Sequence, residues 1–399
     1  MSYRTRFLAG ILTATGLAAI LQAQSAVPAR APFTVHEWGT FTSIAGKDGH
    51  PMEWRPLTGP SELPCFVQAL NPNSVKTPPG GIPALRATVR METPVVYFYS
   101  DRPQTVRARV DFPRGVMSEW YPRAIVPPVA PVPTMQNALG ALEWTNVDLV
   151  PGMAERFPTE DGEASHYYAA RKTDATPIRV GDQQEKFLFY RGIASFDVPI
   201  AATVTPSGSI AVRNDRLHPI GTFVLFERRG AQLGYRIVPD ARGDITIARP
   251  ALDAAVEGMR ADLLKLLAEQ GLYPREAAAM VETWRDSWFE EGARLFYLLP
   301  QGTVDTILPL QINPRPAALT RVFVGRMELV TREIQSEIAG ALRTDDGATL
   351  RKYGRFLEPM TTFVKTKDNE SKAARAIESV ANANRRPSSC AVPVVPAGS

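Results

Sequence analysis

The chain has 399 residues, with 45 Lys or Arg and 41 Asp or Glu, so its formal net charge at pH 7 is +4. Hydrophobic residues make up 44% and charged residues 22%, which excludes a wholly disordered chain, a collagen-like repeat and a polytopic membrane protein. Proline is enriched, because 35 of 399 residues is about 9%, against a usual ~5%. This abundance favours loops, turns and sheet edges over a bundle of helices.

The first residues follow the pattern of a secretory signal peptide. Arg4 and Arg6 give a positive start, and residues 7–21 form an apolar stretch that is too short to span a bilayer. Small residues follow, so we expect a signal peptide over residues 1–26, with an uncleaved N-terminal anchor as the alternative. The mature chain has no other long apolar stretch. We therefore expect it to be periplasmic or extracellular and to lack a transmembrane segment.

Charge and cysteine content narrow the expected partners. Loss of the two signal-peptide arginines lowers the net charge from +4 to +2, and no Lys/Arg-rich run is interleaved with aromatic residues. Nucleic acid is therefore not expected as a partner. The two cysteines of the chain, Cys65 and Cys390, either form one disulfide in an oxidising compartment or leave a free thiol near the C-terminus.

The N-terminal half contains short runs that are typical of strands. Residues 33–44 alternate and are rich in threonine and aromatic side chains, which predicts a strand. Residues 85–100 and 105–112 predict the two strands of a hairpin, with Pro94 at an edge or bulge position. The proline-rich stretch 122–133 predicts a stiff, extended connector.

More short strands are expected at residues 186–190, 209–213, 222–228, 235–239 and 244–248. Glycine and proline separate them at close spacing, which favours an antiparallel sheet or sandwich. After Pro250 the apolar residues recur at helical spacing. Gly271 marks the end of one helix and Pro274 the start of the next, so these two helices should pack as an antiparallel hairpin.

The last third of the chain mixes both kinds of element. We expect strands at 295–299, 304–310 and 319–329, and helices over 334–342 and 350–360. The whole pattern predicts an α+β fold. Its N-terminal part is a β-rich antiparallel sheet or sandwich, and helical hairpins packed on additional strands follow.

Composition predicts three regions after the signal peptide. We expect a β-rich domain over 27–249, with the connector near 122–133, and an α+β helical region over 250–365. The remainder, residues 366–399, is polar and then proline-containing, so we expect a disordered tail unless Cys390 anchors it.

Five segments of the sequence are familiar as a set. They are VHEWGTFTS, METPVVYFYS, HYYAAR, EKFLFYRG and WRDSWFEEGARLFYLLP, at residues 35–43, 91–100, 166–171, 185–192 and 284–300. Together they resemble a family of uncharacterised secreted bacterial proteins with a HEWGTF opening motif. The resemblance covers most of the mature chain. It implies secretion and a single integrated architecture, and it assigns no activity, cofactor or catalytic residue.

His36 and Glu37 begin like a zinc-protease motif, but Thr40 stands where that motif needs its second histidine. In a strand, His36 and Glu37 point to opposite faces, so they are adjacent ligands only if a bulge intervenes. The alternative is that His36 and Trp38 simply share one sheet face.

A second cluster gathers carboxylates and an imidazole within seven residues, from Glu160 to His166. Such groups hold divalent ions, so the candidate metal ligands are His36, Glu163 and His166, and Arg171 follows closely as a candidate catalytic residue. The alternative is a solvated acidic turn.

A third cluster places Asp286 and Glu290 on one helix face, beside Trp284 and Trp288. Paired carboxylates near aromatic rings are used in glycoside hydrolysis, but two acids at this helical spacing more often mark a wet surface. Glu92 lies in an otherwise apolar strand. It must face solvent or be paired, with Arg90 or Arg191 as partner.

Two functions remain open at this stage. The first is an envelope-associated binding or structural protein, because no serine-hydrolase, nucleotide-binding or zinc-protease motif is complete. The alternative is an extracytoplasmic hydrolase, metal-assisted or not, whose candidate catalytic residues are His36, Glu37, Glu92, His166, Arg171 and Glu290. Assembly of these residues in one cleft would favour the hydrolase, and their separation would exclude it. No cofactor follows from the sequence.

Overall fold

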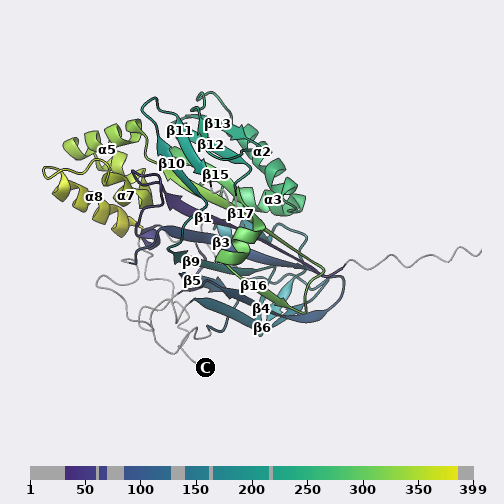
Figure 1. The fold of residues 1–399 in the computed structure, drawn as a ribbon. Helices are drawn as coiled ribbons and strands as arrows, with labels where there is room; N and C mark the ends of the chain where they lie inside the picture. The colour runs from purple at the N-terminus through teal and green to yellow at the C-terminus, as the bar shows by residue number, and fades with distance from the viewer. Residues whose placement is uncertain are drawn as a thin grey trace, which may run out of the picture. The chain divides into compact units, whose positions relative to one another are not determined.

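A computed structural model describes residues 32–59, 63–69, 85–126, 140–160, 165–214 and 219–384. These residues form an α+β fold in which strands come from the whole length of the chain and most helices come from its C-terminal part. Figure 1 shows the sheets at the centre and two separate groups of helices, α2 with α3 and α5 with α7 and α8.

A nine-stranded mixed sheet forms the centre of the fold. Its central strands β1 and β17 pair in parallel, and every other neighbouring pair is antiparallel. The strand order is β13 (Gln232–Val238), β12 (Phe223–Arg229), β15 (Gly292–Leu299), β17 (Ala318–Leu329), β1 (Thr34–Ile44), β3 (Val89–Tyr99), β9 (Leu188–Ala194), β5 (Gly115–Tyr121) and β2 (Gln68–Ala69).

Two smaller antiparallel sheets cover one face of the nine-stranded sheet. The five-stranded sheet has the order β16 (Leu310–Asn313), β4 (Gln104–Asp111), β6 (Ala141–Leu149), β7 (Ile178–Val180) and β8 (Gln183–Glu185). The three-stranded sheet has the order β10 (Ile200–Val204), β11 (Ile210–Asn214) and β14 (Ile245–Ile247). Val35 and Phe41 of β1, Val110 of β4 and Val212 of β11 share one hydrophobic core between these layers.

Helices cover the opposite face. The α2 helix (Val256–Glu269), the α3 helix (Pro274–Thr283) and the short 3-10 helix η3 (His166–Arg171) pack around Trp38 of β1. The C-terminal helices pack around Ile44 at the end of the same strand. They are α5 (Arg332–Thr344), α6 (Gly347–Arg351), η4 (Gly354–Phe356), α7 (Leu357–Thr361) and α8 (Glu370–Ala383). The β1 strand is therefore buried on both faces, as expected of a central strand.

The predicted hairpin between residues 85–100 and 105–112 is wrong, although both strands exist. Every residue of β3 except the last is buried, whereas β4 alternates between buried and more exposed side chains. A strand buried on both faces and a strand buried on one face belong to different layers, so β3 joins the nine-stranded sheet and β4 the five-stranded sheet. The bulge predicted at Pro94 is confirmed by a register shift between Met91 and Val95, but the strand is central and not an edge.

Of three predictions for the C-terminal part, two need correction and one is confirmed. The predicted strand at 304–310 is mostly the α4 helix (Gln301–Ile307), because its buried residues Val304 and Leu308 are four positions apart, which is the spacing of one helix face. The predicted helix over 350–360 is interrupted at Gly354, whose φ of 49° lies in the left-handed region. The predicted helix hairpin after Pro250 is confirmed as α2 and α3, with Gly271 at a φ of 102° between them.

The predicted disordered tail over 366–399 is wrong for its first part, because α8 forms there. Ala373 and Val380 are buried and lie seven residues apart, which places them on one helix face. Residues 385–399, with Cys390, lie outside the described residues, so the predicted disulfide is not tested, although no free cysteine occurs in the described part of the chain. Most of the predicted connector also lies outside that part.

The proposed boundary near residue 250 does not separate two bodies. Strands β15 and β17, which follow it in the chain, lie between β12 and β1, which precede it. The chain from Pro32 onward accordingly makes one compact unit. Within the described ranges, no helix is long and apolar enough to cross a membrane.

Candidate functional site

His36 faces the helices and is bonded to α3. Its Nδ1 atom lies 2.8 Å from the Glu276 carboxylate, which also accepts hydrogen bonds from the Tyr99 hydroxyl at 2.8 Å and from the backbone N–H of Tyr273 at 2.7 Å. The Tyr273 ring packs 4.4 Å from the imidazole. Glu276 is fully buried. These contacts fasten the start of α3 to the sheet, which gives His36 a structural position.

Glu37 points to the opposite face of the sheet, as the strand alternation predicts. It is fully buried and bonded to the Arg321 guanidinium and the Tyr190 hydroxyl. Arg321 also contacts Asp305 of α4 at 2.8 Å. Burial raises the pKa of Tyr190, and the Glu37 charge raises it further. The phenol therefore stays neutral, and its hydroxyl donates a hydrogen bond to the Glu37 carboxylate.

Glu92 is buried and paired, as expected for a charge in an apolar strand. It accepts a hydrogen bond from Thr42 at 2.8 Å and forms ion pairs with Arg90 and Arg355. Burial alone would raise the pKa of Glu92, but these guanidinium groups outweigh it, so the pKa is lowered and the carboxylate is ionised. Of the two predicted partners, Arg90 is confirmed. Arg191 instead donates to Thr93, whose φ is 48°.

Glu290 lies at the partly exposed end of a chain of ion pairs whose other members, Arg326, Glu328 and Arg294, are buried. It binds Arg326 of β17, which also contacts Glu328 at 2.7 Å, and Glu328 contacts Arg294 of β15 at 3.0 Å. The predicted shared helix face of Asp286 and Glu290 is wrong, because α3 ends at Thr283. Residues 284–291, between α3 and β15, form an irregular stretch. The Arg294 guanidinium holds this stretch in place, because it donates to the backbone carbonyls of residues 288, 290 and 291.

His166 and Arg171 lie on η3, beside α3. The His166 Nε2 atom lies 2.6 Å from the Asp286 carboxylate. Arg171 binds Glu185 through two nitrogens, with Nε at 2.9 Å and Nη2 at 2.6 Å, and stacks 4.9 Å from the Tyr168 ring. The third metal candidate, Glu163, lies outside the described residues.

The structure does not bring the described candidates together in one place, although Glu92 and Glu290 both act on the Arg326 charge and His166 shares η3 with Arg171. His36 contacts Glu276 near the start of α3, whereas His166 contacts Asp286 beyond its end. Glu37 lies on the other face of the sheet from His36. Within the described ranges, no group of three His, Cys, Asp or Glu side chains is placed to hold a metal ion.

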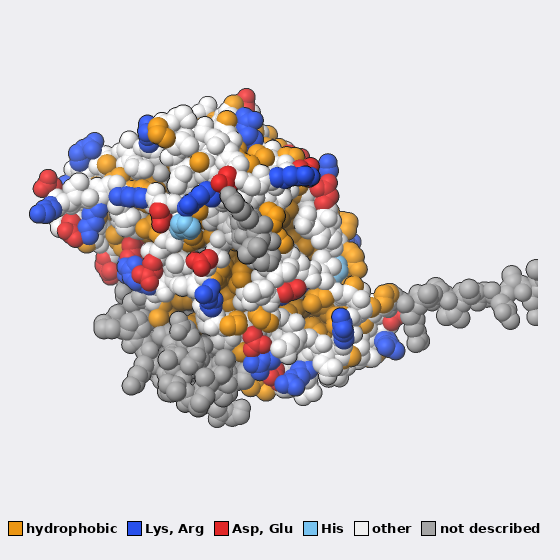
Figure 2. All heavy atoms as spheres, viewed as in Figure 1, with side chains coloured by type: hydrophobic (Ala, Val, Ile, Leu, Met, Phe, Trp, Pro, Cys, Tyr) orange, Lys and Arg blue, Asp and Glu red, His pale blue; other side chains and the backbone are white. Residues whose placement is uncertain are grey.

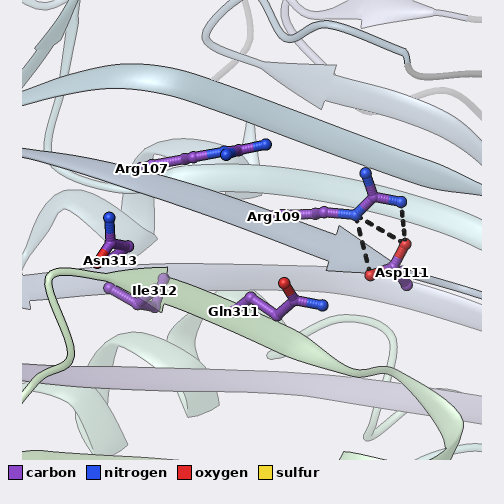
Figure 3. A pocket seen from close by; sticks show the side chains of 6 residues that line it. All are labelled: Arg107, Arg109, Asp111, Gln311, Ile312 and Asn313. Atoms are coloured by element: carbon purple, nitrogen blue, oxygen red, sulfur yellow. Dashed lines mark hydrogen bonds and ion pairs between the residues drawn. The ribbon is translucent and has the colours of Figure 1, made fainter.

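A hollow of about 520 Å³ lies on the outer face of the five-stranded sheet. Six residues line it, and we call it the outer-sheet hollow: Arg107, Arg109 and Asp111 of β4, and Gln311, Ile312 and Asn313 of β16. Figure 3 shows the three β4 side chains in a row, with Gln311 and Asn313 on the neighbouring strand. The polar residues face outward because they alternate with side chains that point toward the core.

The charges of the outer-sheet hollow are balanced. Arg109 donates to Asp111 at 2.7 Å, and Arg107 lies 2.7 Å from Glu143 of β6, which also faces Arg109 at 3.6 Å. Two guanidinium groups therefore meet two carboxylates. Hydrogen bonding to Asp111 raises the pKa of Arg109, so the Arg109 guanidinium stays protonated at any ordinary pH.

Gln311 and Asn313 complete the hollow and were missed by the sequence reading. Both are exposed, and neither side-chain amide has a hydrogen-bond partner within the described residues. Each amide offers two N–H donors and a carbonyl acceptor. The alternation of apolar and polar residues over Leu310–Asn313 indicates a strand with both amides on one face. The strand expected from the sequence was placed at 304–310, several residues too early.

Comparisons with known proteins add no assignment. No model of a protein family matches the chain, and no curated protein matches it. The resemblance to secreted proteins with a HEWGTF opening therefore stays a prediction, and function has to be argued from the geometry.

Proposed function

We propose that the protein is an exported binding protein of the bacterial cell envelope that takes a neutral, hydroxyl-rich ligand, such as a glycan, in the outer-sheet hollow. One observation carries this proposal. The unpartnered amides of Gln311 and Asn313 border a row of guanidinium and carboxylate groups whose charges already cancel. Export is supported by the signal-like pattern of residues 1–26.

The chemistry of the lining favours hydroxyl groups over charged groups. A hydroxyl donates one hydrogen bond and accepts others, and the two amides supply both functions at neighbouring outward positions of one strand. An anionic polymer needs cations without internal partners, whereas Arg107 and Arg109 are already paired with carboxylates. On the face shown in Figure 2, basic and acidic side chains are intermingled and form no extended basic field.

The same geometry weakens the hydrolase alternative. A hydrolytic site needs an acid, a base and a substrate position within mutual hydrogen-bond reach. His36, Glu37 and His166 are instead bonded to three different acidic or basic partners at separated places. A binding surface needs no such assembly and uses side chains presented by a rigid sheet.

The test is a binding measurement on the mature protein. Neutral oligosaccharides are titrated calorimetrically against the wild type and a Gln311→Ala/Asn313→Ala variant. Each lost hydrogen bond is worth about 0.5–1.5 kcal/mol, so loss of two bonds should weaken binding by roughly 5- to 150-fold. Gln232→Ala, which removes an exposed amide on β13, is the matched control and should bind like the wild type. Equal affinity of the double variant, or no saccharide binding at all, contradicts the proposal.

Export also supports a disulfide between Cys65 and Cys390, since an oxidising compartment stabilises such bonds. A thiol assay on the denatured, unreduced mature protein should find no reactive thiol, and reduction should release two. Two reactive thiols before reduction would refute the bond.

A further inference from the structure

A second hollow, of about 250 Å³, lies beside α4 and is separate from the outer-sheet hollow. We call it the α4 hollow. Its apolar wall includes Phe196, Pro199 and Ile307. The segment that carries Phe196 is tied to the turn before β5, because the backbone N–H of Ser195 donates to the Arg114 carbonyl at 3.3 Å. Residues far apart in the chain therefore meet around one small apolar space.

Two opposite charges without partners line this apolar space. Arg114 and Asp197 are both exposed, and within the described residues neither forms an ion pair, with the other or with any third group. Most acidic and basic side chains near the sheets do form such pairs, as Arg107 does with Glu143. An unpaired cation and an unpaired anion on one apolar hollow are a recognition pattern for a ligand that carries both charges.

A third polar group in the hollow lacks a partner. The Thr303 hydroxyl oxygen is buried without a hydrogen bond in the described part of the chain. A buried hydroxyl without a partner costs stability. This oxygen is closed off from solvent, so Thr303 borders the hollow through its other atoms and is assigned no contact with the ligand.

We propose that the α4 hollow binds a small zwitterion with an apolar body, of the size and chemistry of an apolar α-amino acid. Arg114 takes the carboxylate, for which a guanidinium supplies two parallel donors. Asp197 takes the ammonium group. The side chain of the ligand covers Phe196, Pro199 and Ile307 and removes apolar surface from water.

The size of the hollow limits the ligand. Pockets for drug-sized molecules span roughly 300–1,000 Å³, and the α4 hollow, at about 250 Å³, lies below that range. At about 30 Å³ of liquid volume per water molecule, the space corresponds to roughly eight waters. A single amino acid fits this volume.

Ligands with one charge should bind more weakly. A simple acid leaves Asp197 facing an apolar body without a partner, and a simple amine does the same to Arg114. Covering an unpaired charge is costly, so both charges of the zwitterion contribute to selectivity. This inference does not depend on the proposed glycan site, because the two hollows share no lining residue.

The experiment uses L-phenylalanine and two analogues that each lack one charge, 3-phenylpropionate and 2-phenylethylamine. Binding to the full mature chain is followed by ligand-observed NMR and calorimetry. We expect saturable binding of phenylalanine and at least about tenfold weaker binding of each analogue. No saturable binding of phenylalanine, or equal affinities of the three compounds, would overturn the proposal.

Variants separate the roles of the two charges. Arg114→Gln should lose affinity for phenylalanine while binding the amine no worse than the wild type does. Asp197→Asn should lose affinity for phenylalanine while binding the acid no worse. Both positions are exposed, so the fold should tolerate these changes. Arg315→Gln, at an exposed arginine outside the hollow, is the matched control. Wild-type affinity in both hollow variants would refute the assigned contacts.

Discussion

The imidazole of His36 and the carboxylate of Glu276 lie 2.8 Å apart, although 240 positions separate them in the chain. The contact joins the central strand β1 to the start of α3 and occupies the ring nitrogen that faces the helix. A residue that looks catalytic in the sequence thus connects two layers of the fold.

Replacement of His36 by alanine should therefore reduce stability. The buried Glu276 carboxylate loses one of its donors, and such a loss costs about 1–3 kcal/mol. Urea unfolding of His36→Ala measures this cost, and ligand binding by the folded variant should be unchanged. His166→Ala is the comparison, because its partner Asp286 is largely exposed and little stability should be lost. An unchanged unfolding midpoint for His36→Ala would contradict the structural role.

The glycine of the HEWGTF motif should also be a packing residue. A Cβ atom at Gly39 would lie 2.7 Å from the buried Phe323 ring on the neighbouring strand. Gly39→Ala should destabilise the protein by about 1–3 kcal/mol, as overpacking of a core does. Gly302→Ala adds a methyl group in open space on α4 and should be neutral or slightly stabilising. Thermal unfolding of both variants checks the difference, and equal stabilities would show that the ring moves aside freely.

Replacement of a buried arginine in the central sheet should lower the free energy of unfolding. Arg326 is fully buried and contacts both Glu290 and Glu328, so Arg326→Met removes the cation from Glu290 and leaves buried Glu328 with Arg294 as its cationic partner. Removal of one partner from an isolated buried ion pair typically costs about 3–5 kcal/mol, and the retained Arg294–Glu328 pair should keep the loss near the lower end of that range. Arg315→Met, at an exposed position, should cost little. A small loss for Arg326→Met in urea unfolding would mean that the network contributes little to stability.

Strand geometry explains which features the sequence could predict. The opposite orientations of His36 and Glu37, the bulge at Pro94 and the α2–α3 hairpin all follow from local periodicity and from proline and glycine chemistry. These features depend only on residues close together in the chain. They are confirmed in the fold.

The partners of the buried charges could not be predicted in the same way. Glu92 meets Arg355, and Glu37 meets Arg321, only because C-terminal elements return to the central sheet. No local pattern encodes which distant arginine fills a given place. The amides of the outer-sheet hollow were missed for a related reason, since β16 was placed too early and its outward residues, including Gln311, were not recognised.

Glu333 should add a dependence of stability on pH. It lies in the first turn of α5, and partial burial alone would raise its pKa. Hydrogen bonds from its own backbone, Thr331 and Arg249 outweigh burial and lower the pKa of Glu333 from 4.5 to about 2. Because the folded pKa is the lower one, the stabilisation is complete above pH 4.5 and is lost as the pH falls toward 2.

Urea unfolding of Glu333→Gln checks this dependence. The variant should be less stable than the wild type above pH 4.5, and the two should converge as the pH approaches 2. Glu257→Gln removes an exposed first-turn carboxylate on α2 that forms no ion pair within the described residues, so it serves as the control. A constant difference between Glu333→Gln and the wild type over this range would contradict the assigned hydrogen bonds.

The central claim is that the outer-sheet hollow, and not the region of His36, is where the protein meets its ligand. Hydrogen-exchange mass spectrometry of the mature protein with and without a saturating oligosaccharide tests this claim directly. The account predicts slower exchange in peptides that contain β4 and β16 and unchanged exchange in α3. Slower exchange around α3 and His36, with β4 and β16 unchanged, would contradict it.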